Sequence, residues 1–418
     1  MNFRLATLKA FNLALSVGWS FSFVAVLSRA LGMADYAYVA LVSGLGAYVM
    51  SANLGLPALV YSRVREEYLV KAGESGGALA VCVSSIFSAA AVIATLAFSL
   101  WIILFSGLGV KFAIDLLILF AGMALNLPLM VLKAICSSID RYWEFESAET
   151  VRRSISLGLV LTVLGGASLK VYAICYLLIT VMVVVVALFM AKSTFISGVR
   201  YLKDSGIRGV FARDSKSIGG NIWFSLNESA LYNSPYFLIP IVFGVGAEVI
   251  LFDVFARVSR FGAAAYLAVS ESAMPRLSEA NNSGARAKVR GIMWASAGAC
   301  LPVVIGGCLV VAADNGAVLE FLVSGLSVTL WAVLSICLTL SALMAQTLIG
   351  NFLLSTGQVA RALPISMFSV WALVALYAAV AVFSLGGSAF LVGYAGIFCI
   401  SAACYVWSFF HALNSSRK

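Results

Sequence analysis

Long runs of apolar residues alternate with short polar segments along the whole chain. A helix that crosses a membrane needs about 20 predominantly apolar residues, and the runs are of that length. They lack the alternation of apolar and polar residues that marks the strands of a transmembrane barrel. We therefore predict an all-α polytopic membrane protein with twelve transmembrane helices. These cover roughly 10–31, 37–61, 77–105, 112–136, 154–169, 171–191, 217–243, 248–274, 291–312, 325–352, 363–383 and 388–410.

The polar connectors form two alternating sets. One set is long and basic, and together with the two tails it holds 21 of the 27 Lys and Arg residues; it comprises 62–76, 137–153, 192–216, 275–290 and 353–362. The other set is short and holds only Lys111 and Lys170. Cytoplasmic loops carry the excess of Lys and Arg in membrane proteins. We therefore expect the long connectors and both termini to be cytoplasmic.

The longest basic connector lies at the midpoint of the predicted helices. Six helices precede residues 192–216 and six follow them. This arrangement predicts an N-terminal lobe over 1–191, a cytoplasmic linker over 192–216 and a C-terminal lobe over 217–418.

Composition excludes several classes of protein. Hydrophobic residues make up 62% of the chain and charged residues 11%, whereas soluble proteins carry about 25% charged residues. A soluble enzyme and a disordered chain are therefore excluded. The net charge of +9 follows mostly from the basic connectors, so we expect no nucleic-acid partner. One His and eight Cys without a Cys-x-x-Cys pair predict no metal site and no catalytic centre, and the chain lacks a phosphate-binding Gly-rich loop.

The remaining charges lie inside predicted membrane helices, where an ionised group costs several kcal/mol unless it faces protein or water. Asp253, Arg257 and Arg260 fall on one face of the helix over 248–274. One interpretation is an internal ion pair that locks packing. The other is a charged stripe along a water-filled cavity. Because two Arg outnumber one Asp, a cation is left for an anionic ligand such as a phosphate.

Three further charges each have two interpretations. Glu228 shares a helix face with Ser225 and Tyr232, ahead of Pro235; it is either a coupling carboxylate or a neutral, hydrogen-bonded side chain in a packed interface. Lys133 either reaches the cytoplasmic surface or faces a cavity. Arg29 ends the first predicted helix and either pairs with Asp35 or lies at the rim of a cavity.

Residues 29–38, Arg-Ala-Leu-Gly-Met-Ala-Asp-Tyr-Ala-Tyr, resemble the end of the first helix in bacterial polysaccharide flippases of the O-antigen type. Those proteins belong to the multidrug/oligosaccharidyl-lipid/polysaccharide exporter superfamily. The next helix is similar too, with Gly44, Gly46 and Asn-Leu-Gly-Leu-Pro at 53–57. Elsewhere the resemblance is one of architecture: length, twelve spans, inner termini and a central basic linker.

The resemblance implies two six-helix lobes around a central cavity, in the bacterial inner membrane. The substrate would be an oligosaccharide on undecaprenyl pyrophosphate, moved by alternating access without a cofactor, with membrane lipids and other polysaccharide-assembly proteins as partners. By position, the resemblance makes Arg29 a substrate-binding cation of the cavity, and Arg257 and Arg260 match the cationic lining by character but not by a motif. Lys133 is a further candidate substrate-binding cation from its place in the predicted helix over 112–136. Carboxylates that some relatives use are missing, because 363–410 holds no Asp or Glu. For coupling to a proton or sodium gradient, the candidates are Glu228 and Asp253.

Two alternatives stay open. A multidrug extruder of the same fold would need an acidic, aromatic site for cationic drugs. A membrane glycan polymerase or ligase would need a sizeable outer loop with catalytic groups, and the predicted outer connectors are short.

Overall fold

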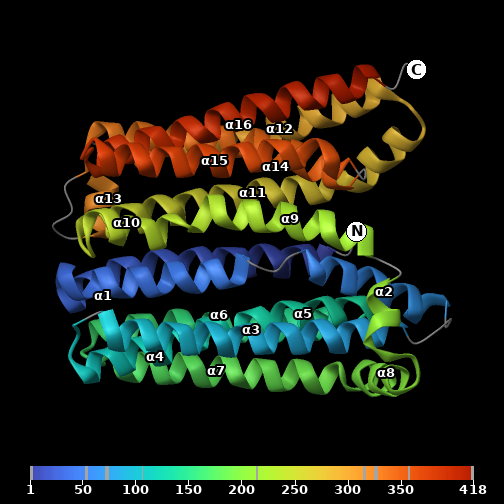
Figure 1. Cartoon of the computed structure of the whole chain (residues 1–418), viewed down its shortest axis with the longest axis horizontal. Helices are drawn as coiled ribbons and strands as arrows, with labels where there is room; N and C mark the ends of the chain where they lie inside the picture. Colours follow the sequence, from blue (N-terminus) through green and yellow to red (C-terminus); the bar gives the residue numbers. More distant parts are fainter. Residues whose placement is uncertain are drawn as a thin grey trace. The chain divides into compact units, whose positions relative to one another are not determined.

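The computed structural model describes residues 3–51, 55–70, 75–105, 107–212, 215–313, 317–323, 328–355 and 358–415. These residues fold into helices joined by short turns, with no strand among them (Figure 1). The prediction of an all-α protein is therefore confirmed. Of the sequence motif at 53–57, Asn53 and Leu54 lie outside the described residues.

Packing divides the chain into two compact units, Met1–Leu226 and Asn227–Lys418. The first contains α1 (Phe3–Ser51), α2 (Leu56–Val70), α3 (Ser75–Phe105), α4 (Val110–Ala124), α5 (Asn126–Ser138), α6 (Tyr142–Leu164), α7 (Leu169–Met190), α8 (Lys192–Ala212) and the beginning of α9 (Ser215–Asn233). The second contains the rest of α9, then α10 (Pro235–Phe243), α11 (Ala247–Asn282), α12 (Arg286–Ala312), α13 (Ala317–Leu322), α14 (Leu330–Ser355), α15 (Val359–Val382) and α16 (Gly387–Ser415).

The chain is a multi-pass membrane protein. Eight helical stretches among the described residues are long and apolar enough to cross a membrane. The four other expected spans also fall in helices. Those helices either continue from a neighbouring span, are broken, or carry several charged residues. Residues 37–61 begin inside α1, while 154–169, 217–243 and 248–274 fall in α6, α9–α10 and α11.

Several helices extend beyond the apolar runs that predicted them. Helix α6 begins at Tyr142, well before the apolar run from 154, and α11 continues to Asn282. The expected linker over 192–216 contains α8, which packs against α3 in the first unit. Hydropathy locates the apolar part of a helix, but a helix continues into charged sequence wherever its backbone hydrogen bonds and side-chain contacts persist.

Two helices break at a proline that follows an asparagine by two residues. Proline has no N–H to donate, so a carbonyl one turn earlier loses its partner. At the α4–α5 break before Pro128, the Asn126 side chain donates to the carbonyl of Met123 at 3.0 Å. At the α9–α10 break before Pro235, the Asn233 side chain donates to the carbonyl of Ser229 at 3.1 Å. The asparagines thus supply donors to the carbonyls beside each break.

Helix α1 is bent at Gly32, whose φ of 77° and ψ of 167° interrupt the helical conformation. This region of backbone space is open almost only to glycine. A Cβ added at Gly32 would meet nothing within 4 Å. The requirement for glycine is therefore conformational and not a matter of space.

We predict that Gly32→Ala lowers the free energy of unfolding by about 1–3 kcal/mol, because alanine must adopt a conformation that only glycine tolerates. Gly158→Ala in α6 is the matched control, since a Cβ there also enters open space but the backbone is helical. That control should be neutral or stabilising. Thermal unfolding in detergent checks both; equal melting temperatures for the two variants would contradict the prediction.

Candidate substrate and ion sites

Asp253 and Arg257 form a buried ion pair one turn apart on α11. The Arg257 Nε lies 2.8 Å from Asp253 Oδ2, and the two side chains are 4% and 0% exposed. The hydroxyl of Tyr236 on α10 donates to the other carboxylate oxygen at 2.8 Å. Both oxygens of Asp253 are therefore engaged. Of the two interpretations of this helix face, the internal ion pair applies to these two residues.

Arg260 lies on the same helix in a different electrostatic environment. Its side chain is partly buried, its Nη2 donates to Asn233 Oδ1 at 3.0 Å, and its guanidinium carbon lies 5.4 Å from the centre of the Tyr236 ring. No carboxylate forms an ion pair with Arg260 in the part of the chain that the structure describes. Its charge is thus stabilised by an amide and an aromatic ring but not neutralised.

The break between α9 and α10 positions the partners of Arg260. Asn233 is the last residue of α9, and Tyr236 follows at the start of α10. Pro235 deprives the Leu231 carbonyl of its usual helical donor, and the hydroxyl of Tyr394 on α16 donates to that carbonyl at 2.8 Å. The buried Tyr394 therefore holds the broken helix in the geometry that directs Asn233 and Tyr236 toward Arg260.

Glu228 is the second candidate coupling carboxylate of this unit. It lies two turns before the break, is partly buried, and accepts no hydrogen bond or ion pair from the other described residues. Tyr232, Tyr394 and Tyr405 are close enough to be affected by its charge. Tyr232 in turn donates to Gln346 at 3.4 Å. Glu228 therefore has no counter-ion among the described residues and lies within electrostatic range of three tyrosines.

The first unit holds the other two predicted substrate-binding cations, on different helices. Arg29 is exposed on α1, and its Nη1 donates to the carbonyl of Ala25 at 2.6 Å. The Lys133 Nζ lies 3.0 Å from Glu146 Oε1, and its side chain is 48% exposed. Lys133 therefore has an internal counter-ion.

A polar cluster that the hydropathy pattern did not reveal joins α1 to α6. Its acids and bases lie within residues 137–153, which the sequence predicts to be a cytoplasmic connector. Glu149 accepts from Arg152 at 2.6 Å and from Arg153 at 2.8 Å. Asn12 donates to Glu146 at 2.8 Å, and its backbone carbonyl accepts from Arg153 at 2.8 Å. The spacings of three, four and seven residues among these acids and bases are helical and would have revealed the shared face.

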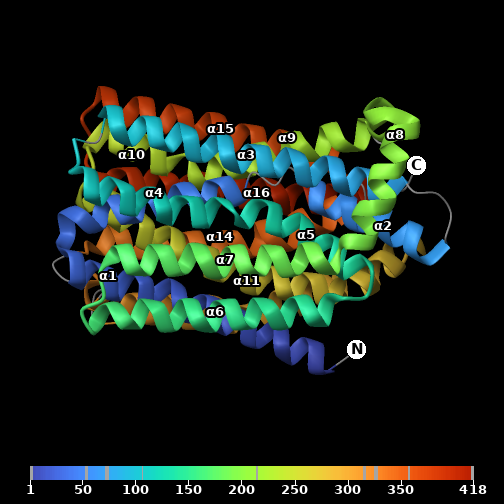
Figure 2. The ribbon, with the colours of Figure 1, turned by 90° about the horizontal axis from the view of Figure 1, so that it is seen from below.

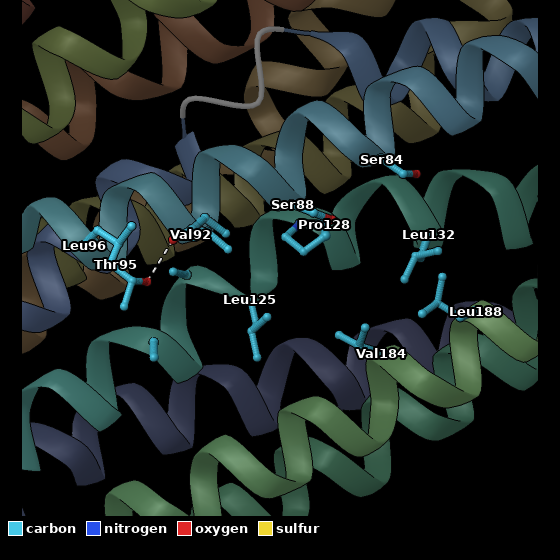
Figure 3. Close-up of a pocket in the computed structure, with 13 residues that line it drawn as sticks. Ser84, Ser88, Val92, Thr95, Leu96, Leu125, Pro128, Leu132, Val184 and Leu188 are labelled. Atoms are coloured by element: carbon cyan, nitrogen blue, oxygen red, sulfur yellow. Dashed lines mark hydrogen bonds between the residues drawn. The ribbon is translucent and has the colours of Figure 1, made fainter.

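An apolar pocket of about 390 Å³ lies between α3, the broken α4–α5 helix and α7 (Figure 3). Leu96, Leu125, Pro128 and Leu188 line it, together with small residues and the hydroxyl of Thr95, which donates to the carbonyl of Ala91 at 2.8 Å. None of the predicted site residues reaches this pocket. Its lining suits hydrocarbon and offers no charge to an ionic ligand.

Metal-ligating side chains do not gather among the described residues: no group of three or more His, Cys, Asp or Glu could hold a metal ion there.

Solved structures of membrane transporters share this architecture. A multidrug resistance MATE family transporter of the MOP superfamily, in its inward-facing conformation, matches with a TM-score of 0.69 and 15% identity over 96% of each chain. A variant of the Vibrio cholerae MATE transporter VcmN matches with a TM-score of 0.69 and 16% identity, over 99% of this chain and 96% of that one.

The chain has the fold of a MATE transporter. A further match with this fold is a MOP superfamily transporter from Pyrococcus furiosus, with a TM-score of 0.63 and 14% identity over 100% of this chain and 96% of that one. No protein-family profile matches the sequence, and no curated protein matches it. The likeness is therefore one of fold, and the MATE fold has twelve transmembrane helices in two lobes.

We predict that Tyr394→Phe lowers the free energy of unfolding by about 1–3 kcal/mol, because it leaves the Leu231 carbonyl buried without a donor. Tyr377→Phe on α15 is the matched control, because the buried Tyr377 hydroxyl has no hydrogen-bond partner among the described residues. The control should be neutral or stabilising. Thermal unfolding in detergent distinguishes the two, and an equal loss in both variants would show that the Tyr394 hydroxyl does not support the break.

Proposed function

We propose that the protein is a flippase that carries an oligosaccharide linked to undecaprenyl pyrophosphate across the bacterial inner membrane by alternating access. The cargo would be the repeat unit of O-antigen or another surface polysaccharide. The observation that carries the proposal is Arg260: a partly buried guanidinium, held by neutral groups, on a helix that the sequence predicts to span the membrane.

An unneutralised guanidinium is costly in a membrane protein unless it serves a ligand. Its planar fork of donors fits the oxygens of a phosphate, so a pyrophosphate supplies the charge that Arg260 lacks. Arg257 is neutralised by Asp253, and that pair holds Tyr236 beneath Arg260. In this proposal Arg260 contacts the pyrophosphate directly, and Arg257 supports it.

A cationic site is compatible with this fold. In the Pyrococcus furiosus transporter, the reverse polarity of the binding pocket suggests a different function for that protein. The same fold thus accommodates pockets of different polarity. Arg29 and Lys133 are the candidate substrate-binding cations of the first unit, where Lys133 would exchange Glu146 for a phosphate oxygen.

Coupling to a proton or sodium gradient is assigned to Glu228 in this proposal. Of the two candidate carboxylates, Asp253 is already paired with Arg257, whereas Glu228 has no partner among the described residues. A carboxylate can take up a cation reversibly only if no permanent counter-ion holds it. Both termini would be cytoplasmic, membrane lipids would surround the protein, and other polysaccharide-assembly proteins would be its partners.

A multidrug extruder is the second candidate, and Glu228 is the observation that favours it. A carboxylate within electrostatic range of Tyr232, Tyr394 and Tyr405 also suits an organic cation, because aromatic faces attract positive charge. Two of the transporters of similar structure belong to the MATE family. The two candidates differ in the charge of the cargo and therefore in which residue binds it.

We predict that Arg260→Ala lowers the rate of transport of a labelled lipid-linked oligosaccharide in proteoliposomes by about 10- to 100-fold, the factor expected for losing a charged hydrogen bond. Arg260→Lys keeps the charge without the planar fork and should retain part of the activity. Arg290→Ala removes an exposed cation from α12 and is the matched control. Normal oligosaccharide transport by Arg260→Ala, with efflux of cationic drugs that depends on Glu228, would favour the extruder.

We predict that Glu228→Gln abolishes the stimulation of transport by an imposed proton or sodium gradient, because the amide cannot exchange a cation. Movement of cargo down its own gradient should persist. Glu144→Gln, which alters an exposed carboxylate on α6, should leave the stimulation unchanged. Transport driven by either gradient in proteoliposomes checks this, and stimulation that survives in Glu228→Gln would exclude Glu228 as the coupling residue.

A further inference from the structure

Helix α8 runs across the spans of the first unit. Figures 1 and 2 show it at one end of that unit, transverse to α3 and α7 in both views. It crosses α3 closely because both helices have glycine at the crossing. A Cβ at Gly198 would collide with the backbone of Gly77, and a Cβ at Gly77 would come within 2.8 Å of the Thr194 carbonyl. The face of α8 that contains Thr194 and Gly198 is therefore fixed against α3.

The opposite face of α8 is exposed and combines apolar with basic side chains. Ile196 and Val199 are 44% and 43% exposed. Lys192, Arg200 and Lys203 are exposed as well. At about 100° per residue, these five positions lie within about 100° of arc. Two aliphatic side chains thus stand among three cations on the side turned away from α3.

The cations on this face have no counter-ion within the described part of the chain. No ion pair joins Lys192, Arg200 or Lys203 to a carboxylate there. Over its length α8 carries four basic residues, the fourth being Arg208, against a single acid, Asp204. The face is therefore complementary to a surface that offers both hydrocarbon and negative charge.

We propose that the exposed face of α8 lies in the membrane–water interface and binds the anionic lipid headgroups of the cytoplasmic leaflet. Amphipathic helices with aliphatic residues among Lys and Arg bind at this depth. The aliphatic side chains enter the acyl boundary, while the long basic side chains extend to the phosphates. Anionic lipids attract each nearby cation. This role does not depend on which molecule the protein transports.

The test is hydrogen–deuterium exchange of peptides covering 192–204, with the full chain in nanodiscs. One set of discs contains phosphatidylcholine alone, and the other a mixture with phosphatidylglycerol. Exchange should be at least about fivefold slower in the anionic discs, which is the factor that one basic side chain at an anionic surface supplies. High salt should reduce the difference, because it screens exposed charges.

The triple variant Lys192→Gln, Arg200→Gln, Lys203→Gln changes only exposed side chains and should abolish the difference between the two lipid compositions. The triple variant Arg286→Gln, Lys288→Gln, Arg290→Gln removes the same number of cations from α12 and should retain it. Ile196→Ser with Val199→Ser should speed exchange in both compositions. Equal exchange of the unmodified protein in both discs, or loss of the difference in both triple variants, would overturn the proposal.

Discussion

Every backbone N–H and carbonyl inside a membrane must find a partner within the protein, because lipid offers none. The two proline breaks show how this chain meets that constraint. Asn126 and Asn233 donate to carbonyls one turn back, and the Tyr394 hydroxyl serves the Leu231 carbonyl that Pro235 leaves without a donor. The second break also positions Asn233 and Tyr236 beside Arg260. The candidate anion site thus depends on the same hydrogen bonds that make the break tolerable.

The fold class could be predicted from the sequence because it follows from one strong signal, the length of the apolar runs. The ends of the helices could not. The charged segment from Tyr142 to Arg153 continues a helix that hydropathy begins at residue 154, because its acids and bases pair along one face. A hydropathy profile counts every charged residue against a membrane helix, whereas an ion pair with helical spacing stabilises the helix in which it lies.

The candidate site was predictable as a set of residues but not as an arrangement. Helical spacing placed Asp253, Arg257 and Arg260 on one face, and the structure agrees. Spacing could not show that Asp253 would engage Arg257 and leave Arg260 to neutral partners, since that choice depends on Asn233 and Tyr236 from two other helices. The same holds for Glu228 and the tyrosines around it, of which Tyr394 and Tyr405 lie far along the chain.

The pairing of Asp253 with Arg257 within one helical turn has a consequence for how the protein is made. Helices enter the membrane during synthesis, before their neighbours are available as partners. Asp253 and Arg257 neutralise each other as soon as that turn of helix forms, so this turn carries no net charge when it meets the lipid. On α6, Glu149 in the same way compensates one of the two positive charges of Arg152 and Arg153. A charge that would impede insertion if it stood alone is thus compensated within its own helix before tertiary packing buries it.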